Sequence, residues 1–90
     1  MTTFKLEPMY DSRKSFYGKA VVERTENEKK LLSYGTHVAS VYFKEEGAIA
    51  EVFDTYSNTT LRHIKDFLYQ SGFEVGNKAF IEKTYIKGDN

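Results

Sequence analysis

The chain has 90 residues and no cysteine, and its 13 basic and 13 acidic residues give a formal net charge of +0. This length fits one domain, and the cysteine-free composition excludes disulfides and Cys-ligated metal sites. The balanced charge argues against a nonspecific binder of duplex nucleic acid, and the aromatic content of 16% is too high for a disordered chain.

The first 15 residues contain Pro8 and the polar stretch Tyr10–Ser15, and they show no regular apolar pattern. We predict an arm or loop over residues 1–15, a single domain over residues 16–86 and a short tail over residues 87–90. The N-terminus lacks the apolar centre of a signal peptide, and no apolar run approaches the length of a membrane span. The protein is therefore expected to stay in the compartment where it is made.

Strand-like patterns fill the first half of the predicted domain. Apolar and polar residues alternate from Phe16 to Glu23, and a polar break at residues 25–28 separates them from a short apolar run at residues 31–34. Gly35 ends that run.

A hairpin is the clearest pattern in the chain. The runs 38–43 and 48–53 are both rich in β-branched and aromatic residues, and Lys44–Gly47 joins them. We expect an antiparallel pair of strands in which Gly47 adopts a positive φ.

One helix follows, and both of its ends carry signals. Ser57 is a suitable N-cap, and Tyr56 before it is placed to pack on the first residue of the apolar stripe. Gly72 ends the helix in a left-handed conformation, and Phe73 contacts the last residue of the stripe. The stripe consists of Leu61, Ile64, Phe67 and Leu68.

The last patterned segment, residues 79–86, predicts another strand after a turn at Gly76 and Asn77. The expected fold is α+β, with a mostly antiparallel sheet of four or five strands and one α-helix packed on one face. A homodimer is compatible with this fold, because one helix leaves part of a five-stranded sheet uncovered.

The first turns of the predicted helix form a candidate binding site. Backbone N–H groups and the helix dipole favour anions at such a terminus, and the hydroxyls of Thr59 and Thr60 lie there. Arg62 is suited to bidentate contact with an anion, with His63 beside it and Lys65 on the same polar side. These residues predict contact with a phosphate or an acidic partner.

The same residues also have a simpler interpretation. Arg62 and Asp66 have the spacing of an ordinary helix ion pair, and His63 next to Phe67 suits a packed, hydrogen-bonded histidine. His37 has no Ser, Cys or carboxylate partner at a spacing that indicates catalysis, and no P-loop, GxGxxG, HExxH or GxSxG motif occurs. The sequence predicts neither an enzyme nor a metal or cofactor site.

The seven tyrosines are too many for all of them to be fully buried in a domain of this size. Tyr17 beside Lys19, and Tyr10 near Arg13, suit a protein interface or the stacking of unpaired bases. The alternative is that each ring packs on the protein while its hydroxyl contacts water.

Three segments, Tyr10–Ala20, Ser33–Ala39 and Tyr56–Gln70, resemble a family of small uncharacterised proteins found in phages and mobile elements of Gram-positive bacteria. The resemblance spans residues 10–72. It implies a small accessory protein in the cytoplasm of a bacterial host cell, where by analogy such proteins bind and block a host or defence component.

The predicted function is therefore a non-enzymatic binding protein that inhibits or sequesters a host protein or a phosphate-bearing small ligand. The alternatives are a protein that binds single-stranded nucleic acid and an unrecognised enzyme with a perturbed His or Glu in a cleft. We expect the arm at Tyr10, the turn at Tyr34 and the helix start at residues 59–63 to converge. The predicted binding residues are Arg62, His63, Thr59, Thr60, Arg13, Tyr34, Lys65 and Tyr17.

Overall fold

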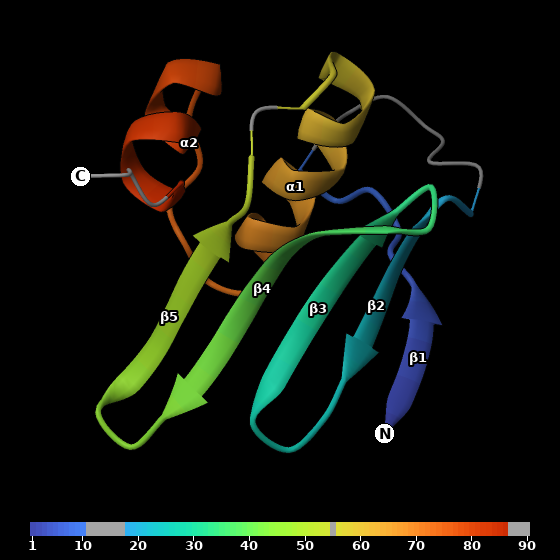
Figure 1. The fold of residues 1–90 in the computed structure, drawn as a ribbon, viewed down its shortest axis with the longest axis vertical. Coiled ribbons are helices and arrows are strands. Elements are labelled where there is room, and N and C mark those ends of the chain that lie inside the picture. Colours follow the sequence, from blue (N-terminus) through green and yellow to red (C-terminus); the bar gives the residue numbers. More distant parts are fainter. Residues whose placement is uncertain (11–17, 55, 87–90) are drawn as a thin grey trace.

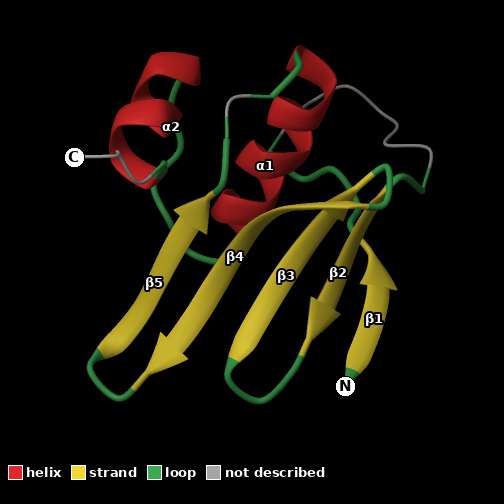
Figure 2. Ribbon diagram, in the orientation of Figure 1, coloured by secondary structure: helices red, strands yellow, loops and turns green. Residues whose placement is uncertain are grey.

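The computed structural model describes residues 1–10, 18–54 and 56–86, and these ranges form an α+β fold (Figures 1 and 2). The strands are β1 (Thr2–Lys5), β2 (Ala20–Arg24), β3 (Glu28–Ser33), β4 (Thr36–Lys44) and β5 (Gly47–Val52). The helices are α1 (Asn58–Gln70) and α2 (Lys78–Tyr85). The fold class is confirmed, with two helices in place of the single predicted one.

The five strands form an antiparallel meander in the order β1-β2-β3-β4-β5. The predicted hairpin is confirmed as β4 and β5, with Lys44 paired to Gly47 and a φ of +131° at Gly47. Tyr34 and Gly35 connect β3 to β4, and both have a positive φ. This two-residue connection is the type that matches the right-handed twist of a hairpin.

Helix α1 has the predicted start and end. The Ser57 side chain accepts a hydrogen bond from the Thr60 N–H at 3.3 Å, which satisfies one of the free donors of the first turn. At the other end Gly72 has a φ of +89°, and the Phe73 N–H donates to the Leu68 carbonyl at 2.9 Å. This is the Schellman arrangement that the sequence predicts.

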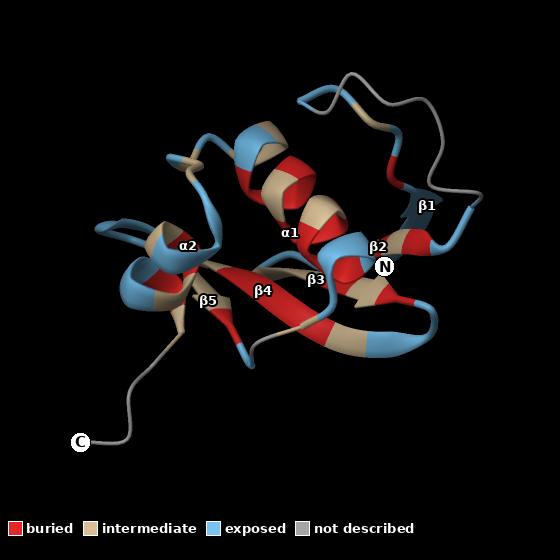
Figure 3. Ribbon diagram, turned by 90° about the horizontal axis from the view of Figure 1, so that it is seen from above, coloured by how far each residue is buried: buried red, intermediate tan, exposed pale blue. Residues whose placement is uncertain are grey.

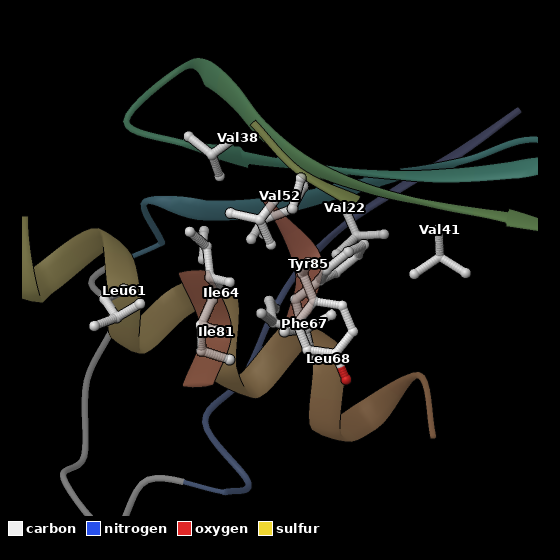
Figure 4. Close-up of a cluster of buried hydrophobic side chains, with 14 residues drawn as sticks. Val22, Val38, Val41, Val52, Leu61, Ile64, Phe67, Leu68, Ile81 and Tyr85 are labelled. Carbon is white, nitrogen blue, oxygen red and sulfur yellow. The ribbon is translucent and has the colours of Figure 1, made fainter. Parts of the chain in front are cut away.

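Both helices pack on the same face of the sheet, and the core lies between them and the strands (Figures 3 and 4). One buried row of the sheet crosses four strands through paired neighbours. The row consists of Val22, Leu31, Ala39 and Val52. The helices contribute the buried side chains Ile64, Phe67, Leu68 and Ile81. We call the opposite side of the sheet the open face, because no described element covers it.

The prediction of an arm or loop over residues 1–15 is wrong for residues 2–5, which form the edge strand β1. All four of its side chains are exposed, so β1 has no inward apolar pattern that would reveal it. Its pairing with β2 supplies the backbone partners instead. Residues 11–15 of the predicted arm lie outside the described residues, as do Phe16, Tyr17 and the predicted tail.

The prediction of a strand over residues 79–86 is also wrong, since most of this segment is α2. The Asn77 side chain accepts a hydrogen bond from the Phe80 N–H at 2.9 Å and begins the helix. Ile81 and Tyr85, four residues apart, are its buried residues. Their aromatic and β-branched side chains suit a strand locally, but burial of a helical face decides the structure. Only Ile86 makes a β-bridge, parallel to Val52.

Candidate functional site

The start of α1 is fastened to the end of β3 by a buried polar network. The Ser33 hydroxyl lies 3.1 Å from Thr60 Oγ1 and 2.8 Å from His63 Nδ1. All three side chains are buried. Two predicted binding residues, Thr60 and His63, therefore use their polar atoms inside the protein.

Burial also sets the charge of His63. Its side chain is 1% exposed, and desolvation lowers its pKa below the ordinary value of 6.5. The neighbouring Arg62 guanidinium lowers the pKa further, and Asp66 opposes this shift. The neutral imidazole is therefore the favoured form near pH 7, and it serves as a packed hydrogen-bonding group.

Tyr34 covers this network from the solvent side. Its ring stacks on the His63 ring, with centroids 5.8 Å apart and planes 30° apart, while 55% of the side chain is exposed. Its backbone φ is +53°, a left-handed conformation that is unfavourable for a bulky side chain. An exposed aromatic residue in a turn position that suits Asn or Gly better is a candidate for partner contact.

A second buried polar group, Asp66, holds the arm segment Glu7–Tyr10 against α1. Its Oδ1 atom accepts hydrogen bonds from the backbone N–H groups of Met9 and Tyr10, both at 2.7 Å, although the side chain is 0% exposed. Gln70 donates to the same oxygen at 3.0 Å and to the Glu7 carbonyl at 2.7 Å. These bonds fix the path of the arm segment across the helix.

The fastened arm segment carries exposed apolar side chains. Met9 is 68% exposed, Tyr10 46% and Tyr69 50%, and the two tyrosine rings lie 5.3 Å apart. We call these three residues the aromatic patch. Exposed large apolar side chains that lie close together on a protein surface often mark an interaction site.

The structure brings part of the predicted constellation together. The Tyr34 turn meets the helix start at His63, and Tyr10 meets the same helix one turn further along, at Asp66 and Tyr69. Thr59 is exposed on the first turn, whereas Arg62 and Lys65 are partly exposed. Arg13 and Tyr17 lie outside the described residues.

Sequence reasoning missed the roles of Ser33 and Asp66. Ser33 falls two residues after the buried Leu31, so strand alternation places it on the core face. Asp66 follows His63 by three residues and precedes Gln70 by four, which places the three side chains on one side of the helix. Those spacings could have indicated a polar row, but not the backbone of the arm segment as its partner.

A different polar chain lies on the open face. Ser40 donates to Glu28 Oε2 at 3.1 Å, and its oxygen lies 2.7 Å from His37 Nε2. A hydroxyl has one proton, so Ser40 must accept from His37 when it donates to Glu28. This direction does not activate Ser40 as a nucleophile, which would have to donate to the imidazole. Sequence spacing did not indicate this contact between His37 and Ser40.

Comparisons place the chain in a family. No curated protein and no solved structure is significantly similar to it. Within the described residues no helix is long and apolar enough to cross a membrane, and no group of three or more His, Cys, Asp or Glu side chains is arranged to hold a metal ion. Residues 4–83 match a single family along nearly the whole chain. The chain belongs to this family, the family of unknown function DUF8033.

Proposed function

We propose that this chain is a non-enzymatic accessory protein of a phage or mobile element that binds and blocks a protein of the bacterial host. The setting follows from the resemblance of residues 10–72 to proteins of phages and mobile elements. The binding residues are those of the aromatic patch, with Tyr34, in the turn between β3 and β4, as a further contact. The partner presents an apolar pocket or groove that accepts these side chains.

The observation that carries this proposal is the fastening of exposed aromatic residues by the buried carboxylate of Asp66. A buried carboxylate is costly unless it is hydrogen-bonded, and here its partners are the N–H groups of the two residues that carry the exposed side chains. The aromatic patch is therefore ordered before a partner arrives. Such pre-organisation reduces the conformational entropy lost on binding.

The residue types support a protein partner. Tyrosine and methionine are enriched in the cores of protein interfaces, and tyrosine is common among the residues whose removal costs most affinity. Tyr34 adds an aromatic side chain that the fold holds in an unfavourable backbone conformation. Strain of this kind is often found where a side chain has a binding role.

A phosphate-bearing small ligand is less well supported. The Thr60 N–H donates to Ser57, and the Thr60 hydroxyl contacts Ser33. His63 is buried, and its pKa is lowered. Two of the groups expected to receive an anion at this helix start, Thr60 and His63, are thus used within the protein.

Single-stranded nucleic acid is also less well supported. Strand alternation places equal numbers of acidic and basic side chains of the described strands on the open face, where unpaired bases would stack, so this face offers phosphates no excess of positive charge. The acidic residues are Glu23, Glu28 and Glu51, and the basic residues are Lys5, Lys30 and Lys44.

The test is photo-crosslinking in a Gram-positive bacterial cell. Tyr69 is replaced by a photoreactive phenylalanine analogue, and the matched control carries the same analogue at Lys83, which is exposed on α2. We expect a discrete protein adduct from position 69 only. Tyr10→Ala should then reduce affinity for the purified partner by about 30-fold, the effect of losing an interface residue worth about 2 kcal/mol.

The melting temperature of Tyr10→Ala should stay close to that of the unmodified protein, because its backbone contact to Asp66 is kept. Equal adducts from positions 69 and 83 would contradict the proposed surface. An adduct with nucleic acid in place of protein would instead support the alternative function.

A further inference from the structure

The sheet has two edges, and only one of them is partly occupied. At β5 the chain returns and Ile86 forms a parallel bridge with Val52. At β1 no described element lies beyond the strand, as Figures 1 and 2 show. All four residues of β1 are exposed, including Phe4 at 45%.

The hydrogen-bond phase shows which backbone groups of β1 face outward. The Leu6 N–H donates to the Ala20 carbonyl at 2.8 Å. The even-numbered residues of β1 therefore direct their backbone N–H and C=O groups toward β2. In an antiparallel ladder the residues between them direct their N–H and C=O groups the other way. Thr3 and Lys5 therefore present their backbone groups along the free edge.

One usual protection of an edge strand, a lysine side chain that points outward from the edge, is not seen on β1 in the described part of the chain. An edge lysine normally discourages pairing when its charge projects outward. The Lys5 side chain instead lies over Gly18, two residues before β2 in the same molecule. A Cβ atom at Gly18 would be 3.4 Å from both Lys5 Cε and Lys5 Nζ. The side chain leans toward β2 and leaves the backbone edge open.

We propose that β1 pairs with β1 of a second copy of this chain, antiparallel and centred on Phe4, to form a continuous sheet across the dimer. In this register Thr3 of each copy exchanges backbone hydrogen bonds with Lys5 of the other. It uses every outward-facing group of Thr3 and Lys5. A shift that centres the pair on Lys5 would place two lysines opposite each other, which is unfavourable.

The side chains of this register are complementary. The two Phe4 rings meet at the symmetry axis, in a position without direct hydrogen bonds where cross-strand side chains approach most closely. Lys5 faces Thr3 of the second copy, and the next residue on that row is Glu23. No like charges oppose each other. Because β1 has only 4 residues, the contact is small and the dimer should be reversible and concentration-dependent.

This inference goes beyond the proposed function and does not depend on it, because it rests on the backbone edge of β1 and uses no residue of the aromatic patch. The first test uses single cysteines, since the chain has none of its own. Phe4→Cys should form a disulfide-linked dimer under mild oxidation, because the two Cα atoms at the symmetry axis lie about 4.5 Å apart.

Thr2→Cys is the matched control on the same strand and the same side of the sheet. Thr2 pairs with Leu6 of the second copy, so the two Thr2 positions lie about 13 Å apart along the strands, too far for a disulfide. We expect Phe4→Cys to crosslink at least about tenfold faster than Thr2→Cys. Equal rates would overturn the proposed register.

The second test is sedimentation equilibrium over a wide range of concentration. Phe4→Lys should raise the dimer dissociation constant about tenfold or more, because two like charges then meet at the symmetry axis. Ile49→Lys is the control on the other edge, since Ile49 is 47% exposed and Phe4 is 45% exposed. It should leave the dissociation constant unchanged.

A protein that stays monomeric at every concentration overturns the proposal. Equal rates of hydrogen exchange with solvent at the Thr3 and Lys5 backbone N–H groups in dilute and concentrated samples would also overturn it. Protection of these amides only after another protein is added would assign the edge to a foreign strand and would likewise exclude the second copy.

Discussion

His63 is buried between α1 and β3, with its Nδ1 atom bonded to Ser33, and this placement links stability to pH. Its pKa in the folded protein is lowered from 6.5, chiefly by desolvation. The unfolded chain therefore binds more protons than the folded protein when the pH falls below that value. The contribution of neutral His63 to the free energy of unfolding is fully present above about pH 6.5, and it is lost as the pH falls toward the lowered pKa of the folded protein.

We therefore predict that the free energy of unfolding decreases between pH 7 and pH 5. Urea unfolding at several pH values would measure this decrease. The pH should stay above the range in which carboxylates ordinarily titrate, so that their protonation does not contribute. His63→Gln is the comparison, because it cannot titrate. A curve for His63→Gln with the same slope as the unmodified protein would show that His63 is not the source.

Asp66 is the residue on which the path of the arm segment depends. Asp66→Ala leaves the N–H groups of Met9 and Tyr10 and the Gln70 side chain without this acceptor. We expect a loss of about 2–4 kcal/mol in the free energy of unfolding, because hydrogen bonds to a charged group are among the stronger ones. Chemical denaturation measures this loss.

Lys65→Ala is the matched control for Asp66→Ala, since Lys65 is the adjacent residue of the same helix and is partly exposed. It should change stability by no more than about 0.5 kcal/mol. Similar effects of the two substitutions would show that the buried carboxylate contributes little.

The position of α2 depends on a close approach at its start. A Cβ atom at Gly76 would lie 2.8 Å from Phe80 Cγ and 2.9 Å from Phe80 Cβ. We predict that Gly76→Ala destabilises the protein by about 1–3 kcal/mol, because the Phe80 ring must move from its place against the core. Thermal unfolding measures the effect.

The double variant Gly76→Ala with Phe80→Ala provides the control for this contact. Removal of the ring should relieve the clash with the ring carbons but not the one with Phe80 Cβ, so Gly76→Ala should cost less in the Phe80→Ala background than in the unmodified protein. Additive effects would indicate that the glycine is needed for another reason.

Elements with local signals were predictable from the sequence, and elements that depend on distant partners were not. Helix α1 was predictable because Ser57, Gly72 and Phe73 act within a few residues of the turns they cap. The β4–β5 hairpin was predictable because Gly47 lies in the connecting loop. Strand β1 was missed because its pairing partner is β2, beyond the arm segment and residues 11–17.

The candidate site divides in the same way. The importance of Tyr34 and the helix start followed from their residue types, but the burial of Thr60 and His63 depends on Ser33, 27 and 30 residues away. The role of Asp66 depends on Met9 and Tyr10, 57 and 56 residues away. For α2 the error was one of type, because Phe80, Ile81 and Tyr85 suit a strand locally and a helix only in the presence of the core.

At the scale of the whole molecule, the N-terminal ten residues belong to the folded unit. They supply β1, the buried Leu6 and both backbone donors to Asp66. We predict that deletion of residues 1–10 abolishes cooperative thermal unfolding, followed by circular dichroism. A variant with both Phe4→Ser and Met9→Ser, which alters two exposed side chains of the same segment, should keep a cooperative transition. Cooperative unfolding of the truncated chain would show that this segment is accessory.

The order of the strands also bears on how the protein folds. In this meander three of the four strand pairings join neighbours through connections of two or three residues, so those contacts form with little loss of loop entropy. The pairing of β1 with β2 and the bonds to Asp66 both require the chain to close over a longer path. We therefore expect the hairpins of β2 to β5 to assemble early in folding. The first ten residues should dock late, after the transition state for folding has been passed. Substitutions at Asp66 should then speed unfolding and leave the rate of folding nearly unchanged.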